Sequence, residues 1–233
     1  MSATAPDPRV RPVRISPRLI VDDVHDQLVR LIMDGHMQPE QSLSIDALAR
    51  EFGVSTSPVR EALARLDSTG LVQRVALRGY RVAPAPDSGE IGELIDARLL
   101  LEPATAAEAA RLESRSALVQ RLDDTLVRLS GAPSGEQFDS FRSYYDADRE
   151  FHRSIFTGVG NRFILQAYDA LGGHVQRFRL FSGKGVTDAE ETVAEHSAIR
   201  DAISDGDPAL AERAMRSHLV GVRHRSLEDL ESV

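Results

Sequence analysis

The sequence predicts a mainly α-helical protein in which an N-terminal winged helix-turn-helix is followed by an all-α antiparallel helical bundle. Three observations support this fold class. Residues 43–82 show the order helix, tight turn, helix and short hairpin. Residues 83–89 hold two prolines and a glycine without apolar periodicity, which is typical of a linker. From residue 90 onward, helical patterns follow one another with short polar breaks and no strand pattern, as in a helical bundle.

Two consecutive helices joined by a tight turn form the centre of the N-terminal unit. Ser44 is a suitable N-cap for the first helix, and Gly53 suits its C-terminal end, where positive φ is common. Ser55 or Ser57 can cap the second helix, which ends at Gly70. Apolar side chains at helical spacing give each helix a face to bury: Ile45, Leu48, Ala49 and Phe52 in the first, and Val59, Ala62, Leu63 and Leu66 in the second.

A helix before this pair and a hairpin after it complete the predicted unit. Gly35 ends the earlier helix. Residues 72–76 and 80–82 have the pattern of two short strands, with residues 77–79 at the tip between them. This order of elements is that of a winged helix-turn-helix, which presents its second helix to the DNA major groove. The apolar face of the earlier helix comprises Val21, Val24, Leu28, Leu31 and Ile32.

The N-terminal end of the second helix and the hairpin tip carry groups suited to DNA. Small hydroxyls and free helix N–H groups can hold phosphates. Arg60 can reach a phosphate or the O6/N7 edge of guanine, and Arg78 suits a contact with the backbone or the minor groove. The alternative is a solvated helix pair, but the caps, glycines and hairpin agree within one short segment. We therefore expect DNA contacts from Ser55, Thr56, Ser57, Arg60, Arg78 and Gly79.

Composition and charge limit the class of protein. The chain of 233 residues is 42% hydrophobic and has no cysteine, so disulfides and thiolate metal sites are excluded. No apolar run reaches the length of a membrane span and no signal peptide is evident, so we expect a cytoplasmic protein without membrane contact. The net charge is −8, with 11 basic and 10 acidic residues in 1–84 but 17 and 26 in the remainder. The acidic remainder is not expected to contact phosphate.

The sequence divides into four segments. Residues 1–17, rich in proline and arginine, are expected to form a flexible arm. Residues 18–84 form the winged helix-turn-helix domain, residues 85–89 the linker, and residues 90–228 the all-α domain. The helices expected in the last domain span 89–112, 115–130, 136–157, 161–182, 188–205 and 208–226.

Four residues of the all-α domain can bind a metal ion from inward-facing positions. Asp148 and His152 are four residues apart, so their side chains meet on one helix face. His196 and His218 lie on the apolar stripes of two later helices. A buried carboxylate is costly when it is charged and unpaired, and these ligands suit Zn, Ni, Mn or Fe. The alternative is a set of hydrogen-bonded core histidines; the four residues taken together favour a metal site.

The run GVSTSPVREALARLDSTGLVQRVALRGYRV resembles the DNA-binding domain of GntR-type transcription regulators. The most specific parts are PVREAL and the following GLV and RGYRV, and the resemblance covers roughly residues 18–84. It implies a regulator that binds double-stranded operator DNA. The family often has arginine directly after the first recognition serine, whereas this chain has Thr56. One base contact, and with it the operator preference, is therefore expected to differ.

The all-α domain is similar to the FCD effector domain of the FadR subfamily of GntR regulators. The matching runs are DREFH at 148–152, GN at 160–161, EH at 195–196 and RSHL at 216–219. In many members of that family the matching aspartate and three histidines bind a metal, and a small carboxylate completes the site. The resemblance thus implies the metal ligands Asp148, His152, His196 and His218.

The same resemblance suggests arginines that could hold an acidic effector. Arg98, in the run DARLLLE, matches the arginine that such domains point towards the effector. A structural ion pair with Glu102 is the alternative role. Arg177 and Arg179 are weaker candidates, because the sequence does not show which of them faces inward.

These observations favour a metabolite-responsive transcription regulator that binds a divalent metal (Zn, Ni or Mn) and a small carboxylate. We expect a homodimer on a pseudo-palindromic operator, since a half-site reader gains specificity from two-fold symmetry. Two other functions stay open: a metal sensor without an organic effector, and a metal-dependent enzyme with a DNA-binding appendage. The sequence shows no nucleophile elbow, phosphate loop or paired catalytic carboxylates, so we expect no enzymatic activity.

Overall fold

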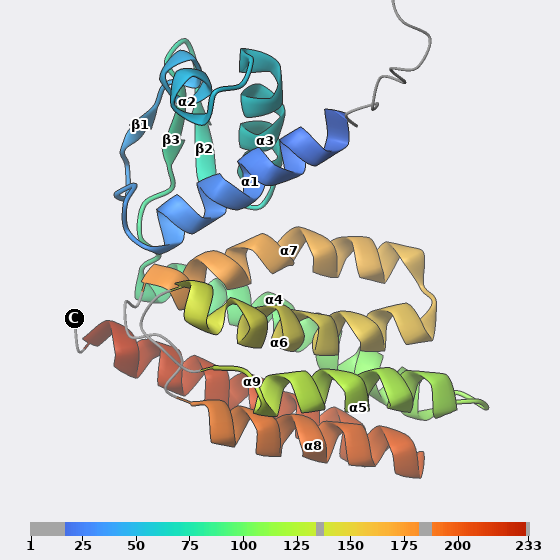
Figure 1. Ribbon diagram of the computed structural model, residues 1–233. Helices are drawn as coiled ribbons and strands as arrows, with labels where there is room; N and C mark the ends of the chain where they lie inside the picture. The colour runs from blue at the N-terminus through green and yellow to red at the C-terminus, as the bar shows by residue number, and fades with distance from the viewer. Residues whose placement is uncertain (1–16, 134–137, 182–187, 232–233) are drawn as a thin grey trace, which may run out of the picture.

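The computed structural model describes residues 17–133, 138–181 and 188–231, so nearly all of the predicted arm lies outside the described residues. It forms two domains (Figure 1). The N-terminal domain contains α1 (Pro17–Met33), β1 (Ser42–Leu43), α2 (Ile45–Phe52), α3 (Thr56–Ser68), β2 (Val72–Val75) and β3 (Gly79–Val82). The C-terminal domain contains α4 (Ser88–Ala110), α5 (Ser116–Ser130), α6 (Phe138–Val159), α7 (Arg162–Phe181), α8 (Ala189–Asp205) and α9 (Pro208–Glu231). The predicted fold class, a winged helix-turn-helix followed by a helical domain, is confirmed.

The N-terminal domain packs its three helices and a small sheet around one apolar core. The sheet is antiparallel, with the strand order β1-β3-β2. The caps behave as predicted for α2: the Ser44 hydroxyl accepts a hydrogen bond from the Ala47 N–H at 3.3 Å, and Gly53 ends the helix with φ of 66°. The apolar face of α3 is fully buried and comprises Val59, Ala62, Leu63 and Leu66.

In the C-terminal domain, α4 packs against more of the other helices than any other helix does. It packs against α6, α7, α8 and α9. Small residues in its second half allow this close approach and line the main apolar core of the domain: Ala106, Ala109 and Ala110. The polar residues in the middle of α4 are therefore enclosed by neighbouring helices. None of the helices in the described residues is long and apolar enough to cross a membrane.

The element boundaries lie close to those predicted, with four differences. Helix α9 continues to Glu231, five residues beyond its predicted end at 226. Strand β1 has no predicted counterpart, because two residues carry no periodic pattern. The hairpin turn spans 76–78 instead of 77–79, since β2 already ends at Val75. The linker is shorter than predicted, because Asp87 caps α4 by accepting a hydrogen bond from the Glu90 N–H at 2.8 Å. The first turn of α4 thus begins inside the segment that the sequence assigns to the linker.

Two contacts join the domains through α6 and α7. The Arg142 guanidinium on α6 donates to the Asp26 carboxylate on α1 at 2.8 Å. His174 on α7 lies so close to Gly70, just after α3, that a Cβ added to Gly70 would be 2.5 Å from the imidazole Cε1. The C-terminal end of α3 thus faces α7. Its N-terminal end and the turn between β2 and β3 point away from the helical domain (Figure 1).

Gly70→Ala is expected to destabilise the protein more than Gly53→Ala. Both glycines have positive φ, 74° and 66°, so alanine costs about 1–2 kcal/mol of backbone strain at either position. Nothing lies within 4 Å of a Cβ added at Gly53, whereas at Gly70 it would overlap His174. Chemical denaturation should show the larger loss of unfolding free energy for Gly70→Ala, and adding His174→Ala should remove the excess. Equal losses for the two glycine variants would contradict the contact.

Candidate functional site

The N-terminal end of α3 presents the predicted DNA-contacting side chains to solvent. Ser55 is the N-cap by its backbone (φ −72°, ψ 166°), but its side chain makes no capping hydrogen bond. Ser57 and Arg60 are exposed and Thr56 is half-buried. Within the part of the chain that the structure describes, Arg60 has no ion-pair partner. These groups are therefore available to an external anion at the positive end of a helix.

Another arginine of α3 has a structural role. Arg65 donates to the Asp22 carboxylate on α1 and to the Glu61 carboxylate one turn earlier, each at 2.7 Å. At the hairpin, Arg78 and Gly79 are exposed, and the Arg78 guanidinium has no ion pair among the described residues. The structure thus places all six predicted DNA-contacting residues at the α3 N-terminus or the hairpin tip, on the side away from the helical domain.

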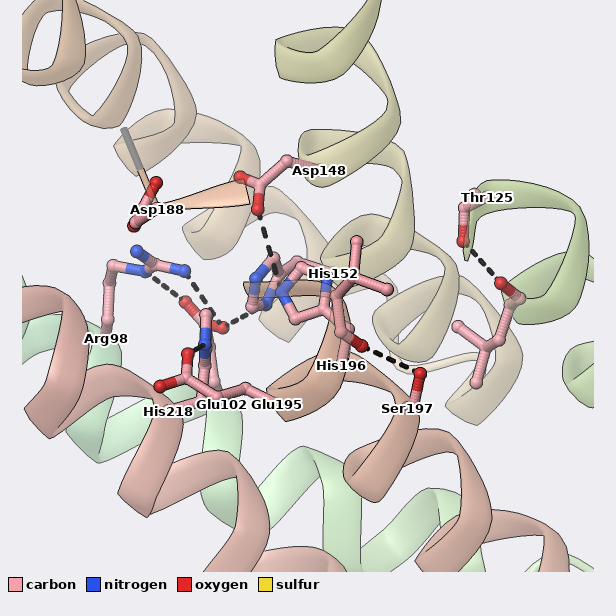
Figure 2. A network of polar contacts seen from close by, with 12 residues as sticks. Arg98, Glu102, Thr125, Asp148, His152, Asp188, Glu195, His196, Ser197 and His218 are labelled. Atoms are coloured by element: carbon pink, nitrogen blue, oxygen red, sulfur yellow. Dashed lines mark hydrogen bonds and ion pairs between the residues drawn. The ribbon is translucent and has the colours of Figure 1, made fainter. Parts of the chain in front are cut away.

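The four predicted metal ligands come together in the core of the helical domain (Figure 2). Asp148 and His152 project from α6, His196 from α8 and His218 from α9, and all four are buried. One nitrogen from each of the three imidazoles lies within 4.8 Å of the others. The Asp148 carboxylate lies 3.6 Å from His196 Nε2. Helices far apart in the sequence thus bring one carboxylate and three imidazoles to a single point.

Two glutamates orient two of the histidines. Glu102 on α4 lies with Oε2 2.7 Å from His152 Nδ1, and Glu195 on α8 lies with Oε2 2.7 Å from His218 Nδ1. Once Nδ1 is engaged, Nε2 is the nitrogen left for a ligand. Both ring nitrogens of His152 are buried and neither makes a hydrogen bond of favourable geometry within the described residues, although Nδ1 lies close to Glu102. The third imidazole, of His196, is held by stacking on the Phe151 ring at 4.1 Å between centroids.

Each glutamate is in turn held by an arginine. Arg98 donates to Glu102 from Nε at 2.5 Å and from Nη2 at 3.3 Å, one helical turn away. Arg225 donates to Glu195 from Nη1 and Nη2, both at 3.0 Å, and to Asp188 from Nε at 2.9 Å. The site therefore contains two chains of the same chemistry, arginine to glutamate to histidine. The first is buried, and the second lies partly exposed at the rim.

The environment favours charged glutamates and a neutral imidazole. Burial alone would raise the pKa of Glu102, but Arg98 and His152 outweigh it and hold that pKa well below its usual range. Burial also opposes ionisation of Glu195, yet hydrogen bonds from His218 and Arg225 lower its pKa to about 2. Burial lowers the pKa of His218 despite the contact with Glu195. A neutral imidazole is the form that binds metal ions.

The residues present fit a divalent metal ion. The donors are nitrogen and oxygen, the set that suits Zn, Ni or Mn. The buried Nε2 of His152 would otherwise forgo a hydrogen bond, which is unfavourable in a protein core. Glutamates on the far nitrogens of two histidines are the usual support of metal-bound imidazoles.

Sequence reasoning identified the four clustered residues but missed their supports, Glu102, Glu195 and Arg225, as parts of the site. The i, i+4 spacing of Arg98 and Glu102 was a usable signal, and the structure contains this ion pair. Neither Glu195 nor Arg225 has a comparable local signal. The side chain of Arg177, on α7, lies outside the described residues.

Comparisons with known proteins identify the family of both domains. Residues 93–221 match the model of the FCD domain, and residues 20–82 match that of the bacterial regulatory proteins of the gntR family. A helix-turn-helix transcriptional regulator in an unstable DNA locus of Streptomyces ambofaciens is 30% identical over 91% of this chain and 85% of its own length. The transcriptional repressor GlaR of Escherichia coli is 28% identical over 81% and 87%. The solved structure of E. coli McbR/YncC has 18% identity and a TM-score of 0.68, covering 88% of this chain and 97% of its own, and so shares the fold.

Glu102→Gln is expected to destabilise the metal-free protein by about 3 kcal/mol or more, because it leaves the Arg98 guanidinium buried without a counter-charge. The control is Glu108→Gln in the same helix, which breaks an exposed pair with Arg111 and should cost less than about 1 kcal/mol. Urea denaturation after chelation of metal measures both. Similar losses for the two variants would mean that the buried pair contributes no more than a surface pair.

Proposed function

The chain belongs to the GntR family of bacterial regulatory proteins and carries an FCD domain, and from this premise we propose that it regulates transcription in response to a small carboxylate held beside a divalent metal ion. Binding of DNA and regulation of transcription are the function of the family. The metal, the carboxylate and the assembly are the parts specific to this proposal. The observation that carries it is the buried cluster of Asp148, His152, His196 and His218.

For the DNA, we propose contacts from the α3 N-terminus and the hairpin tip, with the chain acting as a homodimer on a pseudo-palindromic operator. The two regions lie on the same side of the N-terminal domain (Figure 1). A single α3 reads only a half-site, so two copies related by two-fold symmetry gain affinity and specificity together. The exposed Arg60 is the side chain with the reach and charge for base or phosphate contact.

For the effector, the charge of the cluster favours an anion that binds together with the metal. Arg98 offsets Glu102, but Arg225 is shared between Glu195 and Asp188. Asp148 adds a further carboxylate, so the cluster holds an excess of negative charge. A free anion would be repelled by this cluster, whereas a divalent cation would offset the excess. Arg98 is the candidate second attachment point. Its Nε and Nη2 donate to Glu102, so an acid would meet the Nη1 end of the guanidinium.

For the response, α6 and α7 connect the site to the N-terminal domain. Helix α6 carries Asp148 and His152 and, nearer its start, Arg142, which pairs with Asp26 on α1. Helix α7 packs beside α6, and its His174 side chain contacts Gly70, just after α3. Displacement of α6 by an occupied site would therefore act on α1 and on the end of α3. Coupling of this kind between two sites is typically worth about 1–3 kcal/mol.

Arg60→Ala should weaken specific DNA binding by about 1–3 kcal/mol, the usual worth of a good base or phosphate contact. The measurement is a titration of a duplex that the full-length protein has selected from random-sequence DNA. Arg121→Ala is the control, because it removes the same charge from an exposed position on α5. An unchanged affinity of the Arg60 variant would refute its role. Failure of the wild type to select any sequence would refute specific DNA binding itself.

His152→Ala should lower bound metal and thermal stability together, because it removes one ligand from a buried site. Elemental analysis after incubation with Zn, Ni or Mn and dialysis measures the metal. His224→Ala, at an exposed position on α9, is the control and should retain wild-type content. A wild type that stays metal-free with all three ions would favour hydrogen-bonded core histidines instead.

The same samples test the carboxylate. A panel of small carboxylic acids should raise the melting temperature of the metal-loaded wild type, and should not do so for the chelated protein or the His152 variant. A response of DNA binding to metal alone, with no acid in the panel having any effect, would instead indicate a metal sensor.

A further inference from the structure

The tip of the hairpin contains an apolar residue in an unfavourable backbone conformation. The Arg78 N–H donates to the Val75 carbonyl at 3.1 Å, which closes a four-residue turn. Leu77 occupies the third place of this turn with φ of 62°. That place, at positive φ, is normally taken by glycine or asparagine, because a branched side chain is strained there. The strain is intrinsic to the turn and independent of the rest of the fold.

The Leu77 side chain gains nothing from the protein in return. It is 107% exposed, the highest value among the large apolar side chains that the structure describes. An exposed apolar side chain on a strained backbone stabilises neither the hairpin nor the core. Backbone strain that persists without a structural benefit points to a functional use.

The surroundings of Leu77 indicate what it contacts. Arg74 and Arg78 flank it in sequence; both are exposed, and neither guanidinium has an ion pair among the described residues. The turn lies on the same side of the domain as the N-terminal end of α3 (Figure 1). With α3 in a major groove, the hairpin tip beside it is placed to reach the neighbouring minor groove. The flanking arginines then suit the phosphates on either side.

We propose that Leu77 enters the minor groove of the operator as an apolar wedge against the deoxyribose and base edges beside the α3 half-site. This assignment rests on the proposed DNA-binding function. Apolar side chains that enter the minor groove unstack or press on base steps, and the flanking arginines neutralise phosphate. Leu77 thus contributes affinity and a preference for deformable steps at positions that α3 does not read.

The test uses the full-length protein and the duplex that it selects from random-sequence DNA. Leu77→Gly and Leu77→Asn both tolerate positive φ and remove the apolar group, so each should lower affinity about tenfold or more. Their melting temperatures should equal or exceed that of the wild type. Leu77→Met keeps both the apolar group and the backbone strain, and should bind within about threefold of the wild type.

Two further readouts separate a wedge from a phosphate contact. The slope of log affinity against log salt should be unchanged in Leu77→Gly, but less steep by about one in Arg78→Ala. Methylation of adenine N3, which lies in the minor groove, should interfere with wild-type binding beside the half-site and not with binding by Leu77→Gly.

The proposal is overturned if the glycine and asparagine variants bind the selected duplex like the wild type, or if methionine loses as much affinity as they do. It is also overturned if adenine methylation interferes equally with wild type and Leu77→Gly. If the wild type selects no sequence at all, the DNA-binding function itself fails, which is a distinct outcome.

Discussion

The helical domain depends on one constraint: a charged side chain that is buried among its helices needs a group of opposite charge in direct contact with it. Arg98 and Glu102 are almost wholly buried in the middle of α4. Removing two ions from water costs several kcal/mol each, and only close geometry with further hydrogen bonds offsets this. The second oxygen of Glu102 lies 2.7 Å from His152 Nδ1 on α6. The orientation of α6 against α4, and with it the direction of the imidazole, is therefore tied to the ion pair.

The parts of the structure that could be predicted from the sequence are those that depend on interactions between residues a few positions apart. Helix ends were recognisable from residues such as Ser44 and Gly53, whose side chain or conformation acts within one turn. The inward direction of Asp148 and His152 was indicated by their i, i+4 spacing on an apolar face, and the structure buries both. His196 and His218 were indicated by their places on the apolar stripes of α8 and α9, and the resemblance to FCD domains implied the same set. Periodicity therefore sufficed for the helices, the hairpin and the positions of the four clustered residues.

The features that the sequence could not predict are contacts between elements that lie far apart in the sequence. Glu102 and His152 lie on helices separated by a whole helix, and no local pattern shows that their side chains meet at 2.7 Å. The pairing of Arg225 with Glu195 likewise depends on how α9 crosses α8. Strand β1 exists only because β3 supplies its hydrogen-bond partners, so two residues acquire structure that neither would have alone. Tertiary packing decides each of these cases. The sequence alone does not show this packing, so it could not decide whether Arg98 contacts an effector or pairs with Glu102.

The charge of the site bears on the ligands that we propose for it. The buried ion pair on α4 is neutral, but Arg225 is shared between the carboxylates of Glu195 and Asp188. Asp148 adds a further carboxylate beside the imidazoles, so the site holds an excess of negative charge. Under our proposal a divalent cation would offset this excess, whereas a carboxylate without the cation would add to it. The proposed acid would therefore depend on the metal for binding, and both would act on α6, which carries Asp148.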